Sequence, residues 1–130
     1  MNEEFRTSIE REVMRWPGVN KETAGGGRTR SGFWVPPATV YKFGRRHLGH
    51  VHHDDEGLAD FSFPSEVRQE VVRSGRAIPH PAFPDSRTDA SYQVRSAEDV
   101  PGAVALFRIN YERVKDLVER REARQRRDAS

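Results

Sequence analysis

RRHLGHVHHDDEGLADFSFP, residues 45–64, holds four of the five histidines of this 130-residue chain within seven positions. The first part of the stretch is typical of a strand, and the acidic residues and glycine after it mark a turn. The run GLADFSF, residues 57–63, predicts a further short strand at the edge of a sheet. The stretch therefore predicts antiparallel β-structure, and it raises the question of what a histidine-rich strand does.

The segments around this stretch predict the rest of a small sheet. Short β-type runs occupy residues 33–43, and residues 90–96 alternate like another strand. Residues 78–86 carry three prolines and are expected to form an extended loop. Residues 21–32, which include Gly25–Gly27, predict a mobile loop. A phosphate-binding loop is disfavoured there, because no strand precedes it and no Gly-Lys-Ser/Thr follows.

Three helices are predicted. The first covers residues 2–16, with Asn2 as its cap, and the second covers residues 64–74. The third starts at a capping box, Ser96–Asp99, and its apolar stripe favours packing against the sheet over a coiled-coil seam. The stripe consists of Val100, Val104, Phe107, Tyr111, Val114 and Val118. The fold class predicted by this order of elements is α+β, with an N-terminal, a middle and a long C-terminal helix packed on a small antiparallel sheet.

Composition limits the classes of partner. The chain has 22 basic and 20 acidic residues, and this small excess does not indicate a nucleic-acid partner. Because cysteine is absent, disulfide scaffolds and thiolate sites are excluded. The acidic start, MNEEFRTSIER, does not resemble a signal peptide, and no apolar run is long enough to span a membrane. We expect a cytoplasmic monomer or homodimer that has a small-molecule ligand and no nucleic-acid or membrane partner.

The length predicts a single domain, which we place at residues 1–119. Residues 120–130 contain five arginines and no apolar anchor. They are expected to form a frayed, solvated basic tail.

The histidines allow three interpretations. Residues two apart on a strand share a face, so His50 and His52 are expected to point together, with His47 and His53 on the other face. Two imidazoles on one face are the usual start of a Zn, Fe or Cu site, and Asp60, Asp55, Glu56 and His80 are the available further ligands. A carboxylate such as Asp60 beside a histidine could instead serve acid/base chemistry. The third interpretation is a polar, solvated strand.

One metal motif is partly present. Gly44, five residues, His50-Val51-His52, three residues and Glu56 reproduce the first half of the cupin motif. The second half is missing, and two terminal helices leave too little chain for the long run of strands that a cupin needs. If an ion binds, Zn or Fe is expected, held by His50, His52 and His80 or Glu56.

A broader set of motifs resembles one family, over residues 33–115. These are Gly49-His50-Val51-His52, Ala59-Asp60 leading to Phe63-Pro64, Gly75-Arg76-Ala77, His80 with Pro84-Asp85-Ser86, and a closing helix with Leu106 to Tyr111. Together they resemble the luciferase-domain family, which includes the fungal luciferase and many small bacterial proteins. The resemblance departs at Arg87-Thr88-Asp89, where family members often have Gly-Trp. The aromatic wall that this Trp would form is therefore missing.

The resemblance implies a function and a site. The fungal enzyme oxygenates a hydroxypyrone with O₂ and emits light without a flavin or nucleotide cofactor. By this resemblance we expect no organic cofactor and an oxidoreductase of the monooxygenase kind acting on a small aromatic or enol-type molecule. His50, His52, Asp60 and His80 are then the candidate catalytic residues. A non-catalytic ligand-binding or interaction module and a cupin-like metal-dependent oxygenase remain the alternatives.

Overall fold

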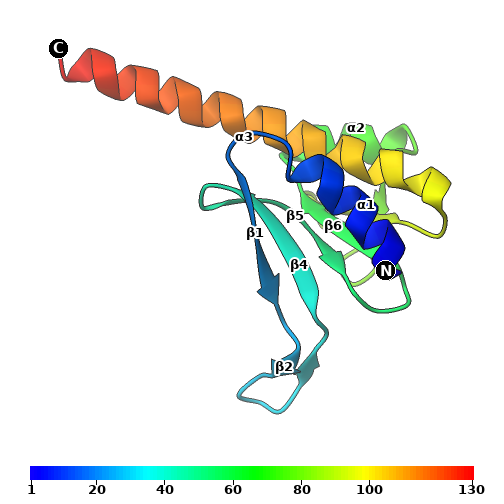
Figure 1. The fold of residues 1–130 in the computed structure, drawn as a ribbon. Coiled ribbons are helices and arrows are strands. Elements are labelled where there is room, and N and C mark those ends of the chain that lie inside the picture. The colour runs from blue at the N-terminus through cyan, green and yellow to red at the C-terminus, as the bar shows by residue number, and fades with distance from the viewer.

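A computed structural model describes the whole chain, residues 1–130, as an antiparallel sheet with helices packed on it (Figure 1). One helix is followed by six strands, a second helix, two strands and the longest helix, which confirms the predicted α+β class. The elements are α1 (Glu3–Val13), β1 (Val19–Ala24), β2 (Gly27–Arg28), β3 (Trp34–Val35), β4 (Ala38–Phe43), β5 (Arg46–His52), β6 (Leu58–Ser62), α2 (Ser65–Arg73), β7 (Ile78–Pro79), β8 (Asp89–Gln93) and α3 (Val100–Asp128).

Six of the strands form one sheet in the order β1-β4-β5-β6-β8-β7, and all neighbours are antiparallel. β2 and β3 pair only with each other. The prediction that residues 57–63 form an edge strand is wrong, because β6 lies between β5 and β8. β8 is separated from β6 in the sequence by α2 and a long connection. The residues next to β6 therefore do not indicate that β8 pairs with it.

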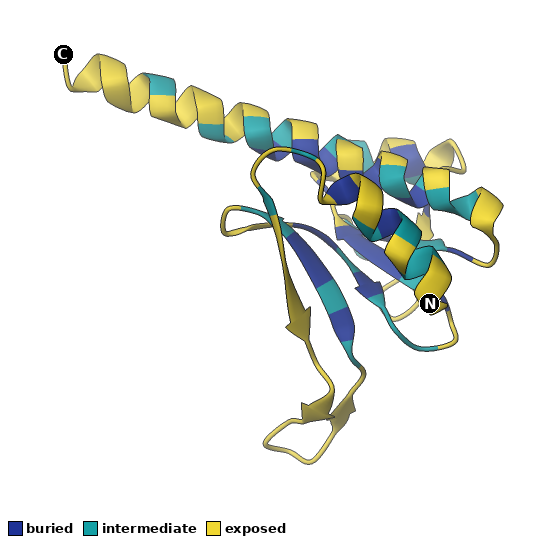
Figure 2. Cartoon of the chain, viewed as in Figure 1, coloured by how far each residue is buried: buried dark blue, intermediate teal, exposed yellow.

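The hydrophobic core lies between the sheet and the helices (Figure 2). The Phe107 ring of α3 packs edge-on against Tyr41 of β4 and Phe61 of β6, at centroid distances of 5.4 and 4.8 Å. Phe107, Tyr111 and Val114 of the predicted stripe are buried, and its other three residues pack partly buried against the core. Packing of this stripe on the sheet is thereby confirmed.

The helix boundaries differ little from the prediction. The capping box of Ser96 and Asp99 is present before α3. Residues 65–73 form α2, with Pro64 as its cap. α1 ends at Val13, earlier than expected, although Trp16 still packs against Tyr111 with ring centroids 5.2 Å apart.

Strands replace half of the loop predicted over residues 21–32, at Lys21–Ala24 of β1 and Gly27–Arg28 of β2, so the loop prediction is wrong for these residues. β1 pairs with β4 along its whole length. The β2–β3 hairpin lies beyond the end of this pair of strands (Figure 1). Every β1 side chain except Val19 is exposed, so no hydrophobic pattern marks this strand. β1 forms because the backbone groups at the edge of β4 need hydrogen-bond partners.

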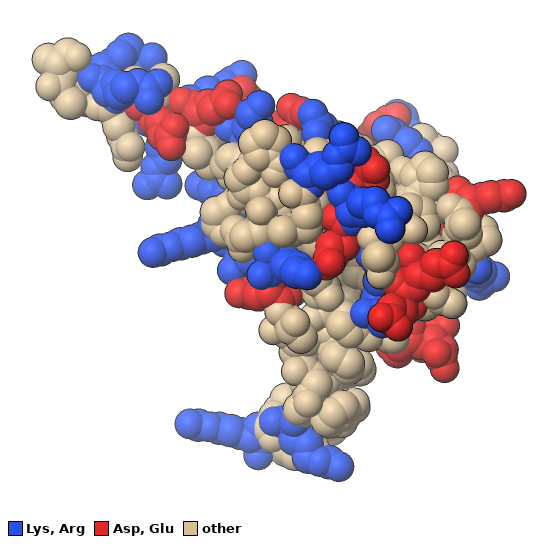
Figure 3. Space-filling model, in the orientation of Figure 1, with Lys and Arg blue, Asp and Glu red and all other residues tan.

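The basic C-terminal segment is solvated but not frayed, which corrects the prediction for residues 120–130. α3 continues to Asp128 and extends beyond the rest of the molecule, with many arginines along its protruding end (Figure 3). Pairs at helical spacing, such as Arg120 with Asp116 at 3.1 Å, favour the helix. No helix, α3 included, combines the length and the apolar character needed to cross a membrane.

Candidate functional site

A β-bulge in β5 decides which histidines share a face. The pairing of β5 with β4 shifts by one residue, so that Leu48 is an extra residue between His47 and Gly49. Leu48 is buried, and a Cβ on Gly49 would lie 2.8 Å from core aromatic rings, so both positions face the core. His47 and His50 consequently line one cavity. The prediction that His47 points away from His50 is wrong, because the bulge interrupts the two-residue alternation.

Asn110 of α3 supports this bulge and was not identified in the sequence. Its side chain is fully buried, and its Nδ2 donates to the carbonyl oxygens of Leu48, at 2.9 Å, and Ser62, at 3.1 Å. The available signal was a polar residue three positions after Phe107 and four before Val114, which places it on the apolar face of the helix. Such a residue needs buried partners, and here they are the bulge and the end of β6.

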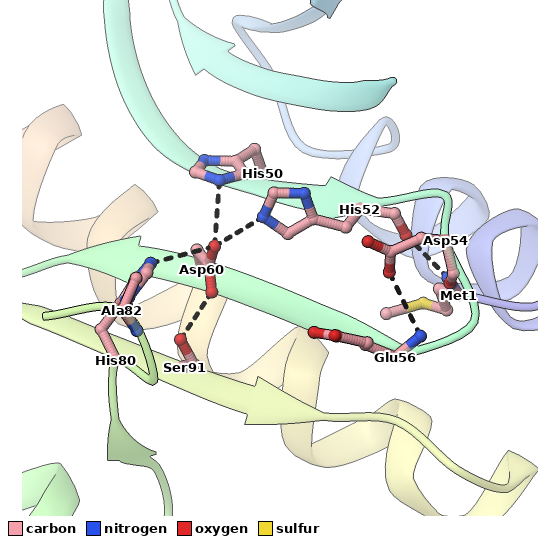
Figure 4. Close-up of polar contacts among 9 residues, drawn as sticks. All are labelled: Met1, His50, His52, Asp54, Glu56, Asp60, His80, Ala82 and Ser91. Carbon is pink, nitrogen blue, oxygen red and sulfur yellow. Dashed lines mark hydrogen bonds and ion pairs between the residues drawn. The ribbon is translucent and has the colours of Figure 1, made fainter. Parts of the chain in front are cut away.

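Three histidines converge on one buried carboxylate, Asp60 of β6 (Figure 4). The Nε2 atoms of His52, His50 and His80 lie 2.6, 3.2 and 3.3 Å from the same oxygen, Oδ2. The other carboxylate oxygen, Oδ1, accepts a hydrogen bond of 2.5 Å from Ser91 of β8. The structure therefore brings together all four residues that the sequence singled out, and it adds Ser91.

The strand pairing explains how these residues meet. His50 and Asp60 are direct partners across β5 and β6, and Asp60 and Ser91 are direct partners across β6 and β8. His52 lies two residues beyond His50 on the same face, as the period of a strand predicts. His80 is the one residue of this cluster that does not lie on β5, β6 or β8.

His80 is held at both ends of its ring. The backbone N–H of Ala82 donates to Nδ1 at 3.1 Å, while Nε2 faces Asp60. The carbonyl of His80 also accepts the backbone N–H of Phe83 at 3.0 Å, which closes a turn in the proline-rich segment. Because Nδ1 accepts a hydrogen bond, the neutral ring carries its proton on Nε2, which lies 3.3 Å from Asp60 Oδ2.

The electrostatics follow from these contacts. Burial alone would raise the pKa of Asp60, but hydrogen bonds from His50, His52 and Ser91 hold it well below its usual range. The hydrogen bond to Asp60 raises the pKa of His52, against the opposite effect of burial. Asp60 is thus a carboxylate at neutral pH and stabilises positive charge on His52.

A cavity of about 270 Å³ lies beside this cluster. One part of its wall is polar, and the remainder includes the apolar residues Leu48, Phe61 and Phe83, of which Leu48 and Phe61 are almost fully buried. Phe83 is 61% exposed, so most of its ring is free to contact a ligand. The polar part comprises His47, His50, Asp60, Ser62, His80 and Asp89.

His53, which was expected on another face, and Glu56, a candidate metal ligand from the sequence, both lie away from the cluster. His53 Nε2 lies 2.7 Å from Thr39 Oγ1, in contact with a different part of β4. Glu56 is exposed on the turn between β5 and β6. The ligand atoms of His50, His52 and Asp60 lie within 4.8 Å of one another. The cupin comparison fails at Glu56 and in the fold, since one open sheet is not a jelly roll.

Comparison with known proteins gives one match. The family model described as Luciferase domain matches residues 45–110, half of the chain, and these residues include His50, His52, Asp60 and His80. No curated protein and no solved structure matches the chain.

Proposed function

Because the chain belongs to the luciferase-domain family, we propose that it is an oxidoreductase of the monooxygenase kind that acts on a small aromatic or enol-type molecule. The single observation that carries the proposal is the convergence of His50, His52 and His80 on the buried carboxylate of Asp60 beside a cavity. Charged and titratable groups packed this closely are more common at functional sites than elsewhere.

The cavity supports a small, flat ligand. Its volume of about 270 Å³ is just below the range of roughly 300–1,000 Å³ typical of ligand sites. Phe83 offers apolar surface to a ring, and His50 and Asp60 offer polar atoms to its hydroxyl group. Phe83 is thereby an exposed aromatic side chain beside the cavity.

The cluster supports proton transfer from such a ligand. An imidazole fixed by a carboxylate is a suitable proton acceptor, because the carboxylate sets its orientation and stabilises the charge that develops. His50 is the one of the two β5 histidines beside Asp60 that also lines the cavity. Loss of the hydroxyl proton makes an enol or phenol electron-rich, and this is the form that reacts with O₂.

Oxygen consumption tests the proposal. The purified chain is given a panel of hydroxypyrones, phenols and enols in an oxygen-electrode cell, and products are identified by mass spectrometry. We expect at least one compound to be oxygenated, with the rate lost in His50→Ala and retained in His53→Ala, since His53 lies away from the cluster. Binding of a compound in native mass spectrometry without any O₂ consumption would instead make the chain a ligand-binding module.

A further inference from the structure

We propose that His50, His52 and Asp60 bind a divalent transition-metal ion, Fe²⁺ or Zn²⁺, and that His80 holds Asp60 without touching the ion. The inference rests on the proposed function only in taking the adjacent cavity as the substrate site. Two histidines and one carboxylate form a ligand set common to non-haem iron and zinc sites.

The first argument is the number of nitrogen atoms around one oxygen. Asp60 Oδ2 has two lone pairs, yet three Nε2 atoms lie within 3.3 Å of it. Oδ1 cannot relieve the crowding, because it accepts the hydroxyl of Ser91 at 2.5 Å. Not all three nitrogens can donate a hydrogen bond to Oδ2. A cation bound between the strands would accept the lone pair of each nitrogen that carries no proton.

The second argument separates His80 from the other two histidines. The N–H of Ala82 occupies the Nδ1 lone pair of His80, so Nε2 carries the proton and has no lone pair for a metal. His52 Nε2 hydrogen-bonds Asp60 Oδ2 at 2.6 Å, but no hydrogen bond makes Nδ1 of His50 or His52 an acceptor. Each of these rings can therefore place its proton on Nδ1 and offer the Nε2 lone pair to an ion. His80 Nε2 lies 3.3 Å from Asp60 Oδ2, so the protonated edge of this ring supports the carboxylate from outside the ligand set.

The third argument is the spacing of the ligand atoms. Bonds of 2.0–2.1 Å in tetrahedral geometry place ligand atoms about 3.3 Å apart. His50 Nε2 is 3.2 Å from Asp60 Oδ2, so this pair already has the required separation. His52 Nε2, at 2.6 Å, needs to withdraw by roughly 0.7 Å to reach the same spacing.

The fourth argument is access. Three protein ligands leave at least one coordination position open, as in catalytic rather than structural metal sites. His50 and Asp60 line the cavity, so an open position there faces the space available to a ligand. With an ion bound, His50 is a ligand and no longer the proton acceptor. The ion would instead polarise the ligand's hydroxyl oxygen and lower the cost of removing its proton.

Metal titration of the untagged full chain tests the inference, since a histidine tag would itself bind metal. The chain is freed of metal with a chelator and titrated with Zn²⁺ by calorimetry and with Co²⁺ by visible absorption, which reports the ligand set. We expect a single ion per chain and an affinity reduced by more than about 100-fold in His50→Ala and His52→Ala, beyond the range for outer residues. His53→Ala, the matched control from the same histidine run, should bind as the wild type does.

His80→Ala decides between the two roles of that residue. A residue that only supports a ligand costs about 10–100-fold in affinity when removed, and the Co²⁺ spectrum should keep the shape of the wild type. A loss equal to that of His50→Ala with a changed spectrum would overturn the assignment of His80. Failure of the wild type to bind an ion, or equal losses in His53→Ala, would overturn the site.

The metal site and the proposed function can fail separately. If the chelated chain still oxygenates a compound of the panel and binds no ion, the metal inference is wrong and the proposed function stands. If an ion binds with the expected pattern of variants but no compound is oxygenated, the metal inference stands and the oxygenase proposal is wrong. Circular dichroism of each variant shows that a loss of binding is not a loss of fold.

Discussion

His52 Nε2 lies 2.6 Å from the buried carboxylate oxygen Oδ2 of Asp60, the shortest of the three histidine contacts with that oxygen. The contact links two adjacent strands at the point where the sheet borders the cavity. The contact favours the charged form of both partners, so it raises the pKa of His52 and lowers the pKa of Asp60.

The first prediction concerns the pH dependence of stability in the chelated protein. The pKa of His52 is raised above its ordinary value of 6.5, so the stability it contributes is fully present below pH 6.5 and lost as pH rises through the raised value. The pKa of Asp60 is lowered, so its contribution is present above 3.8 and lost on further acidification. Thermal melts of the wild type should therefore show a decline on the alkaline side of pH 6.5.

His52→Gln provides the comparison for this prediction, because glutamine keeps a hydrogen-bond donor but does not titrate. The melting temperature of the variant should change less with pH in that window. If both proteins show the same decline, another group causes it. His53 is no alternative cause, because burial lowers its pKa, so its titration contributes stability with the opposite sign.

The second prediction concerns the close approach at Gly49. A Cβ there would lie 2.8 Å from side-chain carbons of both Phe61 and Phe107, which form the centre of the core. Gly49→Ala should therefore reduce the free energy of unfolding by about 1–3 kcal/mol, as overpacking of a core does. Gly27→Ala is the matched control, because no atom lies within 4 Å of its Cβ position. Urea unfolding should separate the two variants, and equal effects would refute crowding as the cause.

The third prediction concerns Asn110, which bonds the carbonyl oxygens of Leu48 and Ser62. Asn110→Leu removes these donors from buried acceptors and should cost about 1–3 kcal/mol for each oxygen left without a partner. Glu112→Leu, an exposed change on the same helix, should have a much smaller effect. Because the bulge positions His47 beside His50, the Asn110 variant should also weaken ligand binding, measured by calorimetry.

The sequence predicts those features that depend on buried side chains. The apolar stripe of α3 follows directly from residue spacing, since most positions on the buried face of a helix are apolar. The shared face of His50 and His52 follows from the period of a strand, and it was predictable because the bulge lies before both residues. Asp60 was a candidate because it follows the histidines by a short turn.

Features that depend on backbone pairing or on distant partners could not be predicted. β1 has exposed side chains and forms through hydrogen bonds with β4, so its composition resembles that of a loop. The bulge at Leu48 depends on Asn110, which lies 62 residues further along the chain. The tautomer of His80 depends on one backbone N–H, and no residue type encodes this contact.

The fourth prediction concerns the protruding end of α3. Truncation after Glu119 removes five arginines and retains Val118, the last residue packed against the core. It breaks the ion pair of Arg120 with Asp116, whose side chains are 78% and 56% exposed. An exposed pair contributes about 0–1 kcal/mol, so the melting temperature should change by no more than a few degrees. A much larger fall, measured at several protein concentrations, would mean that this end of the helix packs against another molecule.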